Sequence, residues 1–180
     1  MKSQILVKRY TQGLVNSVKD ETEFAALHRE LSAFWELLNV HKKLMETLFN
    51  RFLPASRKKQ IAQELLASTP AGTKSVRFLL LLVERGRLEL LPELIQALPE
   101  AWNEKKGVHT YEVASVVPLS DDQGKKLKEK LEHLGKRPVV LKYRIDRELV
   151  GGLLIKRKSM VYDISIKGSL LKLKEKIIEG

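Results

Sequence analysis

The sequence predicts an α+β protein of two domains, a six-helix bundle in residues 1–106 and a small α/β domain in residues 107–180. Two observations indicate this division. Up to Lys106 the apolar residues recur every three or four positions, which is the period of an amphipathic helix. After Gly107 they recur every second position, as in a strand with one buried face. Such a change of period within one chain is typical of a new folding unit.

The first two helices are predicted from apolar stripes and a capping signal. Between residues 4 and 19, the side chains at helical spacing are Val7, Tyr10, Leu14 and Val18. Asp20 followed three residues later by Glu23 is the pattern of a helix N-terminus. The stripe of the second helix consists of Phe24, Leu27, Leu31, Phe34 and Leu38. Together the two stripes predict an αα-hairpin.

Two shorter helices are expected next, at residues 40–52 and 55–67, because Pro54 must interrupt a continuous helix. The fourth helix is expected to bury Ile61 and Leu65.

Two further helices complete the predicted bundle. Residues 73–84 are apolar almost all round, which indicates a helix at the centre of a bundle, and Gly86 ends it. The stripe of the sixth helix consists of Leu88, Leu91, Ile95, Leu98 and Trp102.

The second domain is predicted to begin with a strand at residues 108–117, which Pro118 stops. Ser120 is a suitable N-cap for the helix that follows. That helix is expected to turn apolar side chains inward and most of its lysines outward. The inward residues are Leu127, Leu131 and Leu134.

Three strands and a final helix give the order β-α-β-β-β-α. The strands are expected at residues 139–145, 149–157 and 159–164. A tight hairpin is expected at Lys158-Ser159. The pair Gly151-Gly152 interrupts a strand and therefore indicates a bulge or a close backbone approach, because a phosphate-binding loop would need a helix after it. The packing face expected for the last helix is Ile166, Leu170, Leu173 and Ile177.

The formal charge of +11 raises the possibility of nucleic-acid binding. Up to Lys106 there are 17 basic against 12 acidic residues, and from Gly107 there are 16 against 10. The charge is therefore shared between the halves. Because nucleic-acid binding usually needs a concentrated basic arm or stripe, a basic nucleic-acid-binding module is kept only as the alternative function.

The sequence carries no recognisable catalytic or cofactor motif. The four histidines lack the spacing of a metal site and fall at His28, His41, His109 and His133. Asp121-Asp122 follow the N-cap of a helix, where acidic side chains favour the helix dipole. We therefore expect no enzyme activity, metal or cofactor. The absence of cysteine and of a long apolar segment fits a cytoplasmic origin.

The stretch VVLKYRIDRELVGGLLIK at residues 139–156 resembles the signature of the delta subunit of F-type ATP synthases, the oligomycin-sensitivity-conferral protein family. The positions taken as its structural signature are Asp146, Leu149, Gly151, Gly152 and, further on, Asp163. Supporting similarities run through nearly the whole chain in the same order. They include Arg9-Tyr10, Gly13-Leu14, residues 84–88, residues 113–115 and residues 162–165.

The resemblance implies a non-catalytic subunit of the peripheral stalk, the stator, which joins the catalytic head to the stalk and resists the torque of the rotor. The bundle would hold the amino-terminal helix of an alpha subunit in a groove between its first and fifth helices, and the second domain would hold the carboxyl end of a b-type stalk subunit. The groove residues implied are Leu6, Tyr10, Gly13, Leu14, Phe78, Leu81, Leu82 and Arg85. From spacing alone, Gly13 equally suits close packing within the bundle.

The implied location is the cytoplasmic face of the inner membrane of a bacterial cell, reached only through the complex. The mitochondrial matrix side is the other location open to this family.

Overall fold

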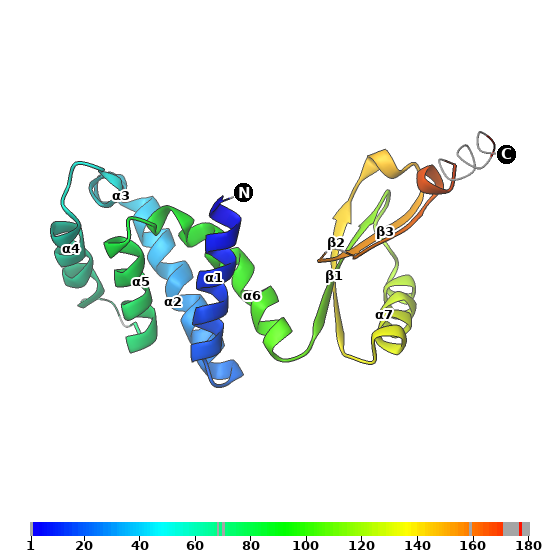
Figure 1. The fold of residues 1–180 in the computed structure, drawn as a ribbon, viewed down its shortest axis with the longest axis horizontal. Coiled ribbons are helices and arrows are strands. Elements are labelled where there is room, and N and C mark those ends of the chain that lie inside the picture. Colours follow the sequence, from blue (N-terminus) through cyan, green and yellow to red (C-terminus); the bar gives the residue numbers. More distant parts are fainter. Residues whose placement is uncertain (1, 68, 70, 159, 171–176, 178–180) are drawn as a thin grey trace. The chain divides into compact units, whose positions relative to one another are not determined.

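The structure, a computed structural model, describes residues 2–67, 69, 71–158, 160–170 and 177. The chain divides into two compact units, Met1–Lys105 and Lys106–Gly180. We call them the bundle and the C-terminal unit. The bundle is helical and the C-terminal unit is built on a sheet, so the predicted α+β class is confirmed (Figure 1).

The bundle contains the six predicted helices. They are α1 (Lys2–Ser17), α2 (Glu21–Val40), α3 (Lys42–Phe49), α4 (Ala55–Ala67), α5 (Thr73–Glu84) and α6 (Leu91–Lys105), with a short 3-10 turn, η1 (Leu88–Leu90), before α6. Helix α1 packs against α6, and α5 packs against α4. Helix α2 contacts both α5 and α6, so it joins the two pairs (Figure 1).

The core of the bundle forms where the apolar stripes meet. All five residues of the predicted α2 stripe are buried. Leu31 and Leu38 are fully buried, as are Leu82 on α5 and Leu91 and Leu98 on α6. Burying a leucine of this kind contributes roughly 2 kcal/mol from apolar transfer alone. The bundle therefore has a continuous core of its own.

Side-chain hydrogen bonds close the helix ends in the bundle. The Asp20 carboxylate accepts from the backbone N–H of Glu23 at 2.8 Å, which confirms the predicted N-cap of α2. Beside the same turn, the Lys105 ammonium donates to the carbonyl oxygens of Val15, at 3.0 Å, and of Val18. Val15 lies in the last turn of α1 and Val18 just after it, where carbonyl oxygens are not paired in the regular helical pattern. Lys105 thus fixes the end of α1 on α6.

The prediction for the buried face of α4 was wrong by one position. Ala62 and Leu66 are buried, while Ile61 and Leu65 are half-buried against the same core. The four residues form one broad apolar face, on which Ala62 and Leu66 are covered most, and α4 packs against α5.

The C-terminal unit is a four-stranded sheet on which α7 packs. Its elements are β1 (His109–Ser115), α7 (Asp121–Gly135), β2 (Val139–Ile145), the 3-10 turn η2 (Arg147–Leu149), β3 (Gly152–Arg157) and β4 (Met160–Ser165). Residues 166–170 are helical. The strand order is β2-β1-β3-β4, with β1 and β2 parallel and the other neighbours antiparallel. The predicted order β-α-β-β-β-α is confirmed.

The core of the C-terminal unit is small. Its fully buried cluster is Tyr111, Val113, Leu131, Val139 and Ile155. Ser120 caps α7, as predicted, by accepting from the backbone N–H of Gln123 at 3.3 Å. The lysines of α7 are exposed, also as predicted.

Three large side chains of the C-terminal unit are largely exposed. Leu134, which was predicted to point inward, is 78% exposed because it lies in the last turn of α7, beyond the row that meets the sheet. Tyr143 and Ile145, on the strand predicted at residues 139–145, are 55% and 48% exposed. Their strand β2 is an edge of the sheet, so a neighbouring strand supports them on one side only.

The predicted packing face of the last helix is also not buried. Ile166, Leu170 and Ile177 are 50%, 61% and 74% exposed, and Leu173 lies outside the described residues. An amphipathic stripe predicts which side chains share a face, but it does not show that the same chain covers that face.

The glycine pair before β3 was predicted to mark a bulge or a close backbone approach, and the close approach is confirmed. Gly152 has φ +79°, and a Cβ built on it would lie 2.2 Å from the carbonyl oxygen of Ile164. The hairpin after β3 is also confirmed, because Arg157 pairs with Met160. Its first turn residue, Lys158, has φ +53°, and Ser159 lies outside the described residues.

Candidate protein-interaction surfaces

Helices α1 and α5 share a surface that we call the α1/α5 surface, formed by Leu6, Tyr10 and Gly13 on α1 and by Leu81 and Arg85 beside α5. The two helices are bridged by the rings of Tyr10 and Phe78, which meet edge to face at 6.2 Å between centroids. Lys74 at the start of α5 forms an ion pair with Glu23, and its ammonium donates to the carbonyl oxygen of Ser17 at the end of α1. The helices therefore run antiparallel on this face.

The residues implied for this site divide into exposed and buried sets. Gly13, Leu81 and Arg85 are exposed, and Leu6 and Tyr10 are half-buried. The buried set is Leu14, Phe78 and Leu82. Only the first set can touch a partner directly, while the second supports it from below.

Gly13 leaves open space on α1. Apart from its chain neighbours and the nearby backbone of α1 itself, no described atom lies within 4 Å of the position that its Cβ would occupy. Gly13 therefore does not serve close packing within the bundle, which was the other explanation that its spacing allowed. A side chain here would project into open space on the same side of α1 as Tyr10, one helical turn away.

Sequence reasoning missed Arg87. Its guanidinium donates to the Tyr10 hydroxyl oxygen at 2.6 Å and lies over the Tyr10 ring, 5.6 Å from the centroid. Arg87 therefore orients the aromatic side chain of the α1/α5 surface. The available signal was its place in the motif at residues 84–88, although the resemblance pointed to Arg85 instead.

A second surface lies in the C-terminal unit. Helix α7 packs mainly over β2, and no other element within the described residues covers the half of the same sheet face formed by β3 and β4. A groove of about 1000 Å³ results, and we call it the α7 groove. Its apolar lining includes Val117, Leu119, Leu127, Leu153 and Ile164.

The rim of the α7 groove is polar. Lys126, Lys130 and His133 border it from α7, together with Glu129. Sequence reasoning did not locate this groove. The signal was available in the element order, since one helix between two strands cannot cover a sheet of four.

Part of the signature at residues 139–156 builds the connection between β2 and β3, next to the groove. The Asp146 carboxylate accepts from the backbone N–H of Glu148 at 3.2 Å and pairs with Arg144 at 3.2 Å. Leu149 is buried, and Val150 has φ +63°, a conformation that β-branched residues rarely adopt. These residues hold the connection that forms one end of the groove.

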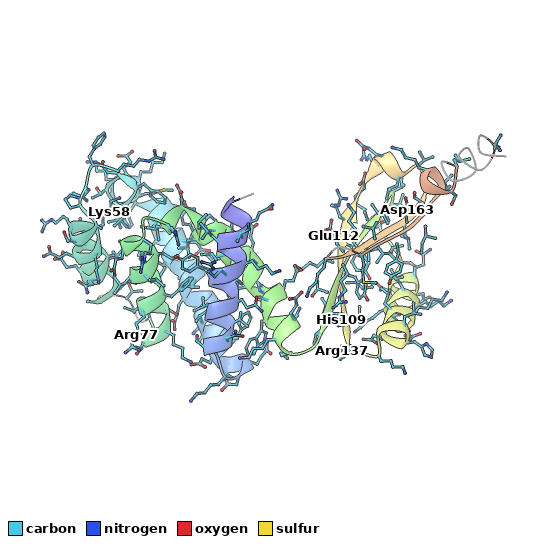
Figure 2. The ribbon with its side chains drawn as sticks, viewed as in Figure 1. Lys58, Arg77, His109, Glu112, Arg137 and Asp163 are labelled. Atoms are coloured by element: carbon cyan, nitrogen blue, oxygen red, sulfur yellow. The ribbon has the colours of Figure 1, made fainter. Side chains whose placement is uncertain are left out.

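Asp163 begins the second part of the signature, which starts the last helix (Figure 2). The Asp163 carboxylate accepts from both the backbone N–H and the hydroxyl of Ser165, at 2.9 and 2.6 Å. The Ser165 hydroxyl oxygen in turn accepts from the N–H of Gly168 at 2.9 Å. A Cβ at Gly168 would lie 2.4 Å from Asp163. Asp163 therefore positions the N-cap of the last helix.

Three carboxylates of the bundle have lowered pKa values. Hydrogen bonds from Thr22 and from the backbone of Glu23 lower the pKa of Asp20. Hydrogen bonds from Lys74 and from the backbone of Lys19 lower the pKa of Glu23. Lys59 lowers the pKa of Glu84 through a hydrogen bond and its charge. These groups stabilise helix ends and helix pairs on the surface.

Among the residues that the structure describes, no group of three or more His, Cys, Asp or Glu side chains is placed to hold a metal ion. Within the same residues, no helix combines the length and the apolar character that crossing a bilayer requires. Each unit does present exposed apolar side chains, at the α1/α5 surface of the bundle and at the α7 groove of the C-terminal unit. Fold and surfaces together define a binding subunit of the helical-bundle plus α/β class.

Residues 6–177 match the family model of the ATP synthase delta (OSCP) subunit, and the chain belongs to this family. ATP synthase subunit delta of Carboxydothermus hydrogenoformans is 31% identical over 177 residues, which cover 98% of this chain and 99% of the relative. ATP synthase subunit delta of a Nostoc species is 32% identical over 165 residues, covering 91% and 89%.

The fold is similar to that of a chain in the mitochondrial ATP synthase hexamer of Toxoplasma gondii. The TM-score is 0.61 at 18% identity, with 96% of this chain and 97% of the other covered. At this identity the likeness concerns the fold alone.

The chain is therefore a non-catalytic subunit of the peripheral stalk of an F-type ATP synthase, and its partners are other subunits of that complex. It associates with the membrane peripherally, through the complex. The nucleic-acid alternative finds no support among these relatives.

Proposed function

We propose that the α1/α5 surface binds the amino-terminal helix of an alpha subunit and thereby fixes the bundle to the catalytic head. The observation that carries this proposal is the open space at Gly13, bordered by Tyr10 on the same helix. An amphipathic helix binds by placing apolar side chains at spacings of three and four into such a surface. Leu81, 39% exposed, offers it an apolar contact from α5.

The bundle is suited to bear load at this surface. The exposed residues rest on Leu14, Phe78 and Leu82, which are buried, and Arg87 holds the Tyr10 ring. A stator must transmit torque without releasing its partner, and a contact with buried apolar anchors is insensitive to salt. A purely electrostatic contact would be screened.

The test is a binding titration of the full chain with a peptide of the alpha subunit's amino terminus. Gly13→Asp should weaken binding at least about tenfold, because a charge would enter the apolar contact. Gln12→Asp is the matched control, since it lies about 100° round the same helix and should change binding less than twofold. Tyr10→Ala is a less specific variant because it also removes the contact with Arg87. Equal binding by wild type and Gly13→Asp would refute the assignment.

We further propose that the C-terminal unit holds the carboxyl end of a b-type stalk subunit, and that the α7 groove receives it. The groove supports this proposal by its apolar lining and by its size, which is at the upper end of the roughly 300–1,000 Å³ typical of ligand-binding clefts. The basic side chains on the rim favour a segment that carries acidic residues beside its apolar ones.

Strand β4 supplies a matched pair of variants. Ile164 lines the groove and is 62% exposed, while Val161 is 54% exposed and points to the opposite face of the sheet. Ile164→Asp should reduce binding of a peptide from the carboxyl end of the b-type subunit by about tenfold, and Val161→Asp should not. If both variants or neither weaken binding, the stalk segment does not bind in the groove.

The bacterial and cyanobacterial relatives support a location at the cytoplasmic face of the cell's inner membrane. Fractionation of cells would test it. The protein should sediment with membranes and be released when the complex is dissociated.

A further inference from the structure

Residues 42–59 carry the net charge of the bundle. This segment, which spans α3, the connecting turn and the start of α4, has six basic residues and one acidic residue. The rest of residues 1–106 has 11 basic and 11 acidic residues. The similar charge of the two halves of the chain therefore conceals a concentration within the first half. The six basic residues are Lys42, Lys43, Arg51, Arg57, Lys58 and Lys59.

The same segment exposes a large aromatic side chain. Phe52, in the turn between α3 and α4, is 96% exposed, and Val40 at the end of α2 is 75% exposed. Scattered exposed apolar residues are ordinary on protein surfaces, but Phe52 is flanked in sequence by the most basic part of the bundle. We call Val40, Phe52 and the six basic residues the α3–α4 patch.

The turn that presents Phe52 is held by hydrogen bonds. The Asn50 side-chain oxygen accepts from the backbone N–H of Phe52 at 2.9 Å, and the Asn50 carbonyl oxygen accepts from the N–H of Leu53 at 3.3 Å. After Pro54, α4 starts with two further backbone hydrogen bonds to the Pro54 carbonyl. The fold therefore places this phenylalanine on the surface and orders the backbone beneath it.

The charges of the patch are largely available to solvent. Lys42, Lys43, Arg51 and Arg57 are exposed. Lys58, labelled in Figure 2, is half-buried, and Lys59 forms an ion pair with Glu84 at 3.0 Å. In Figure 1, α4 lies on the far side of α5 from α1. Most of the patch therefore lies away from α1, and Lys59 connects it to α5 at Glu84.

We propose that the α3–α4 patch is a docking surface for an acidic amphipathic segment of a partner protein. The partner segment should carry acidic residues, because these would pair with the arginines and lysines of the patch and speed association. It should also carry apolar residues to cover the exposed Phe52 and Val40, since buried aromatic side chains are common anchors in interfaces. Such a segment satisfies both features, whereas a purely acidic polymer would leave Phe52 uncovered.

A phosphate-bearing ligand fits the patch less well. Single-stranded nucleic acids bind where several aromatic side chains stack successive bases, and the patch offers Phe52 alone. The chain is moreover a subunit of a multi-protein complex, so protein segments are its established class of partner. The proposal does not depend on which surface holds the alpha subunit.

The experiment uses the full chain carrying Ile164→Asp, which blocks the α7 groove against a segment of similar chemistry, and two synthetic helical peptides of about 20 residues, both rich in glutamate. One carries leucines at spacings of three and four, and its twin carries serines there. Fluorescence anisotropy should show at least about tenfold tighter binding of the leucine peptide. Phe52→Ser should remove this preference. Arg51→Glu/Arg57→Glu should weaken the binding of both peptides about tenfold or more.

The matched control is Arg29→Glu/Arg147→Glu, which changes the net charge equally at exposed arginines outside the patch and should leave binding unchanged. Gly13→Asp should also leave it unchanged, so failure here is distinguishable from failure at the α1/α5 surface. Equal binding of the two peptides, or no binding, would overturn the proposal.

Vesicles of phosphatidylcholine with phosphatidylglycerol, and duplex DNA, test the other occupants. If either binds the wild type more tightly than the leucine peptide, and Arg51→Glu/Arg57→Glu abolishes that binding, the patch binds phosphate groups and the proposal is wrong. Weaker binding to both supports the protein partner.

Discussion

In the bundle, the apolar stripes of α1, α2, α5 and α6 converge on one core whose largest leucines are fully buried. In the C-terminal unit, the helix that packs on the four-stranded sheet within the described residues is α7. Most of the large exposed apolar side chains belong to the C-terminal unit, including Tyr143, Val150, Ile164, Ile166 and Leu170. A bundle can close around its core because every helix has neighbours on several sides. One helix cannot close a four-stranded sheet.

The comparison shows how the two units can use different binding chemistry. The bundle has a core of its own, and the features that we propose for binding a partner there are local, namely the open position at Gly13 and the α3–α4 patch. The C-terminal unit leaves an apolar groove that a partner segment would complete. We therefore expect the stability of the C-terminal unit to respond more strongly to a bound partner.

The largest expected effect separates the units directly. Gly152→Val should destabilise the C-terminal unit by about 4 kcal/mol, because the new Cβ would collide with the Ile164 carbonyl and φ would be strained. Amide hydrogen exchange should report the loss of protection in the strands. Both tryptophans, Trp35 and Trp102, lie in the bundle. The unfolding transition followed by their fluorescence should therefore be the same as in the wild type. A common shift of both signals would contradict separate stability.

The next effect is expected in the bundle. Leu31→Ala should lower the free energy of unfolding by about 3 kcal/mol, because it leaves a cavity at a fully buried position. Urea unfolding followed by tryptophan fluorescence measures it. Ala33→Ser, on the exposed side of the same helix, is the control and should cost less than about 0.5 kcal/mol.

A smaller effect tests how limited the core of the C-terminal unit is. Ser120→Ala removes the N-cap of α7 and should cost about 1 kcal/mol. Exchange of the amides in α7 should accelerate accordingly, and Ser120→Asp, which keeps a capping oxygen, should restore protection. No change in Ser120→Ala would mean that packing on the sheet alone determines the stability of α7.

The smallest effect is the acid response of the bundle. Folding lowers the pKa values of Asp20, Glu23 and Glu84, so their stabilisation is present above the unfolded pKa values, near 4. This stabilisation is lost as the pH falls through the lowered pKa values of the three carboxylates in the folded state. Urea midpoints measured from pH 7 down to about pH 2 should therefore decrease at the acid end. Asp20→Ser keeps a capping oxygen without the charge and should flatten part of this decrease.

Local signals in the sequence predicted the elements well. The α2 stripe, the Asp20 and Ser120 caps and the glycine pair at Gly152 depend on residues close together in the chain, so their chemistry is readable without the fold. The face of α4 was off by one position, because the neighbouring helix determines which row of a broad apolar face is covered most.

The candidate surfaces were less predictable. The resemblance implied eight residues for the α1/α5 surface, and three of them are core residues. It did not indicate Arg87, whose contact with Tyr10 joins positions 77 residues apart. The α7 groove likewise forms between elements whose relation depends on strand order.

By itself, the sequence determined the α+β class, the element order, the caps and the family, because apolar periodicity, capping residues and motifs are local properties of the chain. Only the tertiary structure decided which apolar residues remain exposed. Periodicity shows that side chains share a face, whereas the covering of that face depends on the packing of distant elements. Ile164 and Ile155 lie on the same face of the sheet, yet only Ile155 has α7 and its neighbours to bury it.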